Sequence, residues 1–224
     1  MSRTDRRMVV GLSLVFFVSG FAALLYQVVW QRMLGLFSGS DVRSVTLVTG
    51  AFLGGLGIGS WLGGRLADRL DSTGAIRAYG LCNFGIAAFA VISKWLFYDL
   101  LFKQVGGLNT SVAMTLVIAF VSLLWPTVLM GLSLPLLARA VVKTMAGAAR
   151  RISLLYGINT LGAAVGALLT GWFVVGTFGM ELTLIIGAGL SLISGGTALW
   201  LIRNVMPVSG STESAALSEG RRRV

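Results

Sequence analysis

Two apolar segments of this 224-residue chain carry glycines at the same spacing. In each segment the pattern is G-x4-G-x3-G-x4-G, and the second copy begins 107 residues after the first, counted from Gly50 to Gly157. The same displacement places Arg32 on Arg139. The glycines of the two copies are Gly50, Gly55, Gly59, Gly64, Gly157, Gly162, Gly166 and Gly171. A spacing kept in two distant segments indicates an internal repeat, so we expect two structurally related halves.

The composition places both copies in a membrane. Hydrophobic residues make up 56% of the chain and charged residues 12%, and the mean hydropathy is +0.87. A helix needs about 20 mostly apolar residues to cross the bilayer. The segments that meet this length are 8–31, 44–64, 76–96, 111–138, 152–177 and 182–202. The sequence therefore predicts an all-α membrane protein with six transmembrane helices in the lipid bilayer.

An odd number of helices in each half makes the second half enter the bilayer from the opposite side. The two predicted repeats, about 8–99 and 111–203, hold three helices each, so we expect an inverted repeat. Inverted three-plus-three repeats build each half of major facilitator transporters, and one domain over residues 1–203 would correspond to one such half. Residues 204–224, rich in Ser, Gly, Glu and Ala, are predicted to form a disordered cytoplasmic tail.

Basic residues are unevenly distributed over the ends of the predicted helices. With the amino terminus in the cytoplasm, all but four of the 18 Lys and Arg residues lie on the inner side. The four on the outer side are Arg32, Arg43, Lys94 and Lys103. This positive-inside bias predicts that both termini lie in the cytoplasm. The membrane is then expected to be the inner membrane of the cell. The net charge of +10 then follows from topology, and nucleic-acid binding is not expected because no basic patch is interleaved with stacking aromatics.

The residue types that carry metal or acid–base chemistry are scarce. The chain has no His and one Cys, Cys82, so we expect no metal site, no cofactor and no internal disulfide. No Asp, Glu, Lys or Arg lies in the middle of a predicted span, and Asp41, Asp99 and Glu181 lie at the outer edge. A proton-driven pump working alone is therefore not expected, since such carriers usually hold a titratable group within the membrane.

Uncharged polar side chains inside the predicted spans are the candidates for a substrate-binding site. They are Gln27, Tyr26, Asn83, Ser133, Tyr156, Asn159 and Thr160. An amide buried in lipid is costly without a partner, so Asn83 and Asn159 are expected to face another helix or a cavity. Tyr26 equally fits an interfacial anchor. Pro126 and Pro135 lie in the fourth span, where a kinked helix that lines a cavity and simple packing both remain open.

The loop after the second predicted span carries a second motif. Its Gly-x3-Asp-Arg pattern is similar to an element of major facilitator transporters whose charge pairs brace one gating state. Arg65, Asp68 and Arg69 of this loop, together with Arg139, are the predicted gating residues. Asp71 departs from that element, which usually has glycine there. An ordinary helix end with interfacial charges is the alternative interpretation.

The repeated glycines also allow two interpretations. Small residues let helices approach closely in lipid, where no hydrophobic effect drives them together. The glycines are therefore helix-packing residues, either in a static seam or on surfaces along which the second and fifth helices slide during alternating access.

Five stretches of the chain together resemble a known family. They are residues 19–35, 63–69, 126–131, 134–139 and 155–163. They resemble membrane-bound spermidine synthase-like proteins, also called fused major facilitator/spermidine synthases. Residues 176–179 depart from the family, which commonly has proline before a leucine-glycine turn at that point.

The resemblance implies a function without catalysis by this chain. In the fused proteins a soluble aminopropyltransferase-like domain follows the helices, and none of its catalytic residues is present here. The resemblance thus implies a non-catalytic membrane domain that moves or presents a small polar solute. Because the family is linked to spermidine synthesis, the resemblance points to an amine-related solute. Its partner would be a second copy or a separate aminopropyltransferase-like subunit. A membrane anchor or assembly subunit without transport activity is the alternative.

Overall fold

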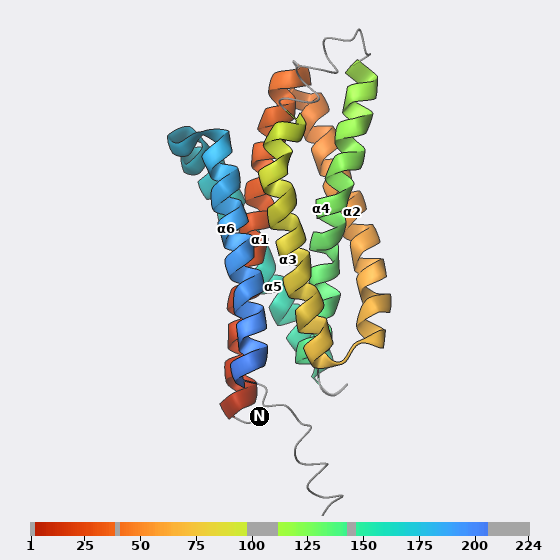
Figure 1. The fold of residues 1–224 in the computed structure, drawn as a ribbon, viewed down its shortest axis with the longest axis vertical. Coiled ribbons are helices and arrows are strands. Elements are labelled where there is room, and N and C mark those ends of the chain that lie inside the picture. Colours follow the sequence, from red (N-terminus) through yellow and green to blue (C-terminus); the bar gives the residue numbers. More distant parts are fainter. Residues whose placement is uncertain (1–2, 39–40, 98–111, 143–146, 206–224) are drawn as a thin grey trace, which may run out of the picture.

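The computed structural model describes residues 3–38, 41–97, 112–142 and 147–205, and the regular secondary structure in these ranges is helical. Its elements, coloured along the chain in Figure 1, are α1 (Arg3–Ser38), α2 (Asp41–Arg69), α3 (Ser72–Lys94), α4 (Val112–Val141), α5 (Ala148–Leu169), the π-helical turn η3 (Thr170–Val174) and α6 (Val175–Val205). The predicted all-α fold is confirmed. Residues 206–224 of the predicted tail, Asp99 and Lys103 lie outside the described residues.

Five helical runs in the described part of the chain are long and apolar enough to cross a membrane. They are Met8–Leu36, Val42–Arg69, Ser72–Phe97, Val117–Val141 and Ala148–Asn204. The last run has 57 residues and joins the fifth and sixth predicted spans, which we expected to be separate helices. The structure therefore differs from the prediction at this one connection.

The joined run is interrupted at Gly179, where φ is 73° and ψ is 174°. Glycine adopts this backbone conformation readily because it has no Cβ. No proline occurs between residues 148 and 178, so the backbone stays hydrogen-bonded and changes from α to π geometry at η3. In Figure 1, α6 then runs back along the molecule and packs against α1 and α3.

The turn between α2 and α3 is formed by a single cap. The side chain of Asp71 accepts a hydrogen bond from the backbone N–H of Gly74 at 2.9 Å, which satisfies one of the free donors at the start of α3. Only two residues separate the end of α2 from the start of α3, and the two helices run in opposite directions through the bundle (Figure 1).

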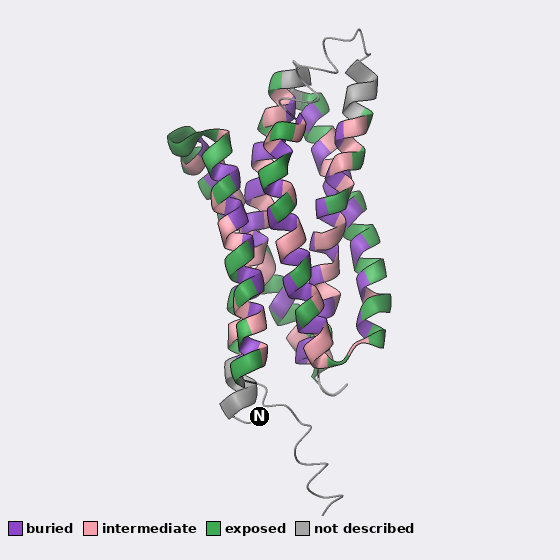
Figure 2. Ribbon diagram, in the orientation of Figure 1, coloured by how far each residue is buried: buried purple, intermediate pink, exposed green. Residues whose placement is uncertain are grey.

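The helices pack mainly as two close pairs. α2 lies along α4 and α1 lies along α5, while α3 contacts both α4 and α6, and α6 also contacts α1. Buried residues face the interior of this bundle and exposed residues face outward (Figure 2). The exposed residues include large apolar side chains, among them Trp61, Trp125, Trp172 and Trp200. Soluble proteins rarely expose so much apolar surface, so the long apolar helices and this exterior indicate a membrane protein.

Aromatic side chains and their hydrogen bonds hold one end of the core together. Trp30 is fully buried, stacks on Tyr26 with ring centroids 5.3 Å apart, and meets the ring of Phe89 edge-on at 5.5 Å. The indole N–H of Trp30 donates to Ser93 Oγ at 3.0 Å, and the hydroxyls of Tyr26 and Ser191 lie 3.0 Å apart. Each polar tip is thus paired across helices, as a medium without water requires.

Candidate functional site

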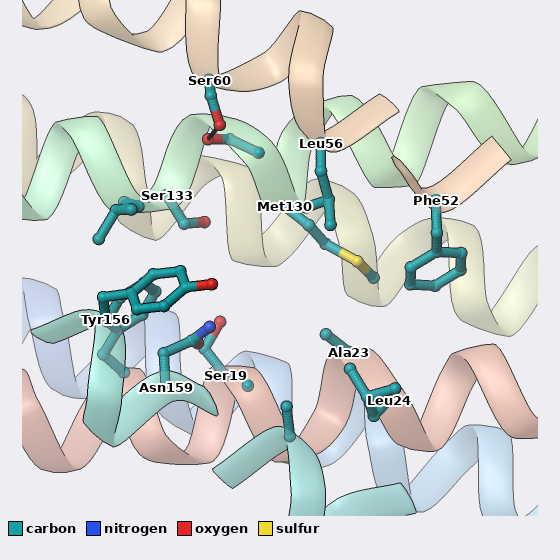
Figure 3. A pocket seen from close by; sticks show the side chains of 15 residues that line it. Ser19, Ala23, Leu24, Phe52, Leu56, Ser60, Met130, Ser133, Tyr156 and Asn159 are labelled. Carbon is teal, nitrogen blue, oxygen red and sulfur yellow. Dashed lines mark hydrogen bonds between the residues drawn. The ribbon is translucent and has the colours of Figure 1, made fainter. Parts of the chain in front are cut away.

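A cavity of about 220 Å³ lies between the α1–α5 pair and the α2–α4 pair (Figure 3). Its polar lining side chains come from all four helices and are Ser19 of α1, Ser60 of α2, Ser133 of α4, and Tyr156 and Asn159 of α5. Figure 3 shows these five toward one end of the cavity. The other end is lined by Ala23, Leu24, Phe52, Leu56 and Met130. The cavity therefore has a polar end and an apolar end.

Two of the polar side chains are available to a ligand. The hydroxyl of Tyr156 and the carboxamide of Asn159 make no hydrogen bond to any other described residue, and both point into the cavity in Figure 3. Ser19 and Ser133 are loosely engaged, since the first donates to Asn83 Oδ1 and the second to the Leu129 carbonyl, each at 3.4 Å. Typical O–H···O distances are near 2.8 Å, so these serines can exchange partners at low cost.

Proline chemistry explains the position of the remaining serine. Pro135 has no backbone N–H, which leaves the carbonyl of Gly131, four residues earlier in α4, without its helical donor. Ser60 Oγ donates to that carbonyl across the helix pair at 3.4 Å. From the sequence, the prolines of α4 could mark either a helix that lines a cavity or simple packing. Because Gly131 and Ser60 both line the cavity, the carbonyl that Pro135 leaves free lies at the cavity wall.

The α1–α5 pair is held close enough to place Asn159 against Gly20 of α1. A Cβ on Gly162 would overlap the carbonyl oxygen of Phe17, and a Cβ on Gly166 would overlap that of Phe21. Backbones therefore touch directly along this seam, as small residues permit in membranes.

The α2–α4 pair has an equivalent seam. A Cβ on Gly59 would overlap the carbonyl oxygen of Val128, and a Cβ on Gly55 would overlap the hydroxyl of Thr127. That hydroxyl donates to the Leu123 carbonyl at 2.8 Å within α4 and lies 3.2 Å from the Ala51 carbonyl of α2. The second seam thus adds a polar contact between its helices.

The outer glycines of the repeated pattern lie elsewhere. Gly64, Gly157 and Gly171 have open space where a Cβ would be, and Gly50 has only an ordinary contact with Phe120. Only the two central glycines of each copy therefore require the absence of a side chain.

The structure places three of the seven predicted binding residues in the cavity, namely Ser133, Tyr156 and Asn159. The other four do not line it. Tyr26 is buried in the aromatic core, and Gln27 is half-buried away from the cavity. Asn83 lies behind Ser19 and donates to the Tyr79 carbonyl at 3.0 Å. Thr160 is exposed, and its hydroxyl donates to the Tyr156 carbonyl at 2.8 Å.

Sequence reasoning missed Ser19, Ser60 and the apolar wall of the cavity. Serine is small and common in membrane helices, so it carries little signal unless the helix face is known. Ser60 lies one residue after Gly59, and the packing of that glycine on α4 brings the serine to the cavity edge. The apolar residues of the cavity look in sequence like any lipid-facing or core residues.

The predicted gating residues lie at one end of the α2–α4 pair. Arg139 Nε donates to the Leu70 carbonyl at 2.9 Å, which ties the end of α4 to the α2–α3 turn. The guanidinium of Arg65 lies 3.8 Å from the ring centroid of Trp61. Asp68 and Arg69 are exposed, and neither forms an ion pair with another described residue. The contact in this loop is therefore an arginine–carbonyl bond in place of the charge pairs expected.

A matching bond lies at the opposite end of the bundle. Arg32, near the end of α1, donates to the carbonyl of Gly171 in η3 at 3.0 Å. Lys94, at the end of α3, forms an ion pair of 2.6 Å with Glu181 of α6. Each of the two helix pairs thus has an arginine on one helix that holds a backbone carbonyl at or just after the end of the other.

No group of His, Cys, Asp or Glu that could hold a metal ion occurs in the described ranges. Comparison of the chain with family models, with curated proteins and with solved structures gives no match. The resemblance to spermidine synthase-like proteins stays a prediction from the motifs.

Proposed function

We propose that this chain is a non-catalytic membrane domain that binds a small polar solute in the cavity between its helix pairs and moves or presents it across the membrane. The observation that carries this proposal is the cavity itself, which is lined by four helices and holds two polar side chains, Tyr156 and Asn159, that make no hydrogen bond within the described part of the chain. Binding sites between helices of a bundle with a few convergent polar groups are the usual form of small-ligand sites.

We propose that the two halves form an inverted repeat, which would support the moving role. Exchanging α1 with α4, α2 with α5 and α3 with α6 turns the α2–α4 pair into the α1–α5 pair and the α3–α4 contact into the α1–α6 contact. The glycine contacts obey the same exchange at the 107-residue displacement, because Gly59 on Val128 corresponds to Gly166 on Phe21. Repeats of this kind build transporters that rock one unit against the other around a fixed site.

The two arginine bonds fit such a rocking motion. Arg32 and Arg139 are related by the same displacement and lie at opposite ends of the bundle. With both termini in the cytoplasm, as the charge bias predicts, Arg139 would secure the inner end of one pair and Arg32 the outer end of the other. We propose the cytoplasmic membrane of the cell as the location on the same ground.

We propose a partner by analogy with half of a transporter. A single six-helix unit supplies one wall of an alternating-access pathway, so a second copy or a separate aminopropyltransferase-like subunit would complete it. Mass determination of the tagged protein from native membranes in mild detergent would separate a homodimer from a complex with a soluble subunit.

Uptake into liposomes tests the proposal. Purified protein is reconstituted and offered radiolabelled small solutes, including amines, amides and alcohols, with protein-free liposomes as background. The variant Ala23→Phe should block uptake, because the larger side chain fills the apolar end of the cavity. Thr160→Val, on the exposed side of α5, is its control. We expect saturable uptake that Ala23→Phe removes and Thr160→Val retains. Uptake equal to background for every solute would overturn the moving role.

The alternative is an anchor or assembly subunit. It is favoured by the direct backbone contacts at Gly59 and Gly166, which suit a rigid seam. A soluble partner that co-purifies in fixed ratio, together with absent uptake, would support it.

A further inference from the structure

The cavity is lined without any charged side chain. Its polar groups are three hydroxyls of serine, one of tyrosine and one carboxamide, and its other lining residues are glycine or apolar. The ion pair between Lys94 and Glu181 lies at one end of the bundle, and neither residue lines the cavity. The cavity is open on the side where Ser60 and Tyr156 are exposed. Because no lining side chain is charged, a charged ligand finds no counter-charge here, and a charge within the membrane is costly without one.

The polar end of the cavity offers both kinds of hydrogen-bonding group. The amide of Asn159 supplies two N–H donors and one acceptor, and the hydroxyl of Tyr156 both donates and accepts. Ser133 faces them from α4 across the cavity in Figure 3. A ligand group that donates and accepts at once, such as an amide or a hydroxyl, satisfies these side chains. An ammonium group can donate to their acceptors, but it cannot accept, so it leaves the N–H donors of Asn159 unmatched.

The apolar end determines the size and polarity of the part of the ligand beyond its polar group. Leu24, Phe52, Leu56 and Met130 form its walls, and Met130 can adapt to the shape of what it contacts. A cavity of about 220 Å³ is smaller than the roughly 300–1,000 Å³ of sites for drug-sized molecules. The space suits a short chain of a few carbons beyond the polar group.

We infer that the cavity takes an uncharged amphipathic molecule, with an amide or hydroxyl head at Tyr156 and Asn159 and a short apolar body against Phe52 and Met130. This inference rests on the proposed binding function of the same cavity and narrows its ligand. It separates the chain from the protonated amines that the family resemblance implies. The cavity has no carboxylate to pair with an ammonium group, and a polyamine carries charges at both ends of its methylene chains, so it has no uncharged end for the apolar wall.

Saturation-transfer NMR on the full-length protein in nanodiscs tests the ligand class. The probes are pentanamide, which is neutral, n-pentylamine, which carries nearly the same chain as an ammonium ion at pH 7, and spermidine. Empty nanodiscs measure partitioning into lipid. We expect saturable protein-dependent signal for pentanamide, and binding at least about tenfold weaker for the two amines.

Variants locate the binding. Asn159→Leu keeps the size of the side chain and removes its hydrogen bonds, so we expect pentanamide affinity to fall about two- to tenfold. Ala23→Phe should abolish saturable binding, while Thr160→Val should leave it unchanged. Thermal unfolding in detergent identifies any variant that fails to fold, and a Ser133→Ala variant then replaces it as the test of the polar end.

The outcomes separate the ligand class from the moving role. Equal or tighter binding of n-pentylamine or spermidine, or pentanamide binding that survives Ala23→Phe, overturns the inference. Pentanamide binding at the cavity without uptake into liposomes supports the ligand class and overturns only transport. Uptake of amines without pentanamide binding supports transport and overturns the ligand class.

Discussion

The two glycine seams use the same backbone contact but differ in what surrounds it. On both, a central glycine lies against the carbonyl of the facing helix, Gly59 on Val128 and Gly166 on Phe21. The α2–α4 seam adds a threonine hydroxyl between the helices, whereas Gly162 of the α1–α5 seam meets the backbone of Phe17. The comparison shows that both seams bring backbones into contact, while each seam has its own side-chain chemistry.

The end of each pair differs as well. α2 stops at Arg69 and the chain turns at once through the Asp71 cap, while α5 continues through η3 to Gly179. A single carboxylate cap gives a short, defined turn, and a π-helical turn followed by glycine gives a longer one. α2 and α5 are thus followed by different connections, which makes the two ends of the bundle distinct.

The largest effect is expected from adding a methyl group to a seam. Gly59→Ala and Gly166→Ala should each lower the free energy of unfolding by about 1–3 kcal/mol, because the new Cβ overlaps a backbone carbonyl that cannot move alone. Thermal or denaturant unfolding in detergent measures both. Equal losses of unfolding free energy would support the equivalence of the two seams. A loss in only one of the two variants would contradict it.

A smaller effect should belong to the α2–α4 seam alone. Thr127→Val keeps the shape of the side chain and removes the hydroxyl near the Ala51 carbonyl, so we expect a loss of about 0.5–1.5 kcal/mol. The matched change Ser122→Ala in the same helix removes a hydroxyl that bonds only within α4, at 2.8 Å from the Ile118 carbonyl. If both variants unfold alike, the hydroxyl of Thr127 contributes nothing between the helices.

The outer glycines should respond in the opposite direction. Gly157→Ala should raise the free energy of unfolding by about 0.5–1 kcal/mol, because the position is helical and has open space for the methyl group. Gly162→Ala, five residues later on the packed face, is the comparison and should destabilise. Destabilisation by Gly157→Ala would show that this glycine contacts something beyond the chain itself.

The smallest and most local effects are expected at the two arginines. Arg139→Gln should speed amide hydrogen exchange in the α2–α3 turn, and Arg32→Gln should do so around η3, because each loses a bond to a carbonyl there. Global stability should change by about 0.5 kcal/mol or less, since both side chains are exposed. Faster exchange at both ends in either variant would instead indicate that the two arginine bonds are coupled.

The sequence predicted more of the fold than of the site. Apolar length alone predicts helices over most of their extent, because a chain in lipid must satisfy its backbone within each segment. It placed a break between Thr177 and Leu182, where the structure has one interrupted run with its bend at Gly179. The glycine spacing predicted eight packing glycines without distinguishing among them. The contacts with the facing helix show that Gly55, Gly59, Gly162 and Gly166 pack closely, whereas the other four do not.

For the site, the outcome depended on which helix face each residue occupies. Tyr26 and Asn159 are both polar side chains in apolar spans, yet Tyr26 finds Ser191 in the core and Asn159 points into the cavity. Whether such a side chain is paired in the core or points into the cavity depends on the rotation of its helix and on the helix that faces it. Neither can be read from the residue type or its spacing. Ser60 shows the same limit, since its place at the cavity follows from the packing of Gly59 and from Pro135 on another helix.

The amino-acid sequence by itself determined the helical class, the membrane-compatible exterior and the repeated glycines, because these depend on local composition and period. The tertiary structure decided which glycines touch, which carbonyl Pro135 leaves for Ser60, and that a cavity with a polar and an apolar end lies between the helix pairs. The physical reason is that a cavity is a property of four helices at once, whereas each segment encodes only its own faces.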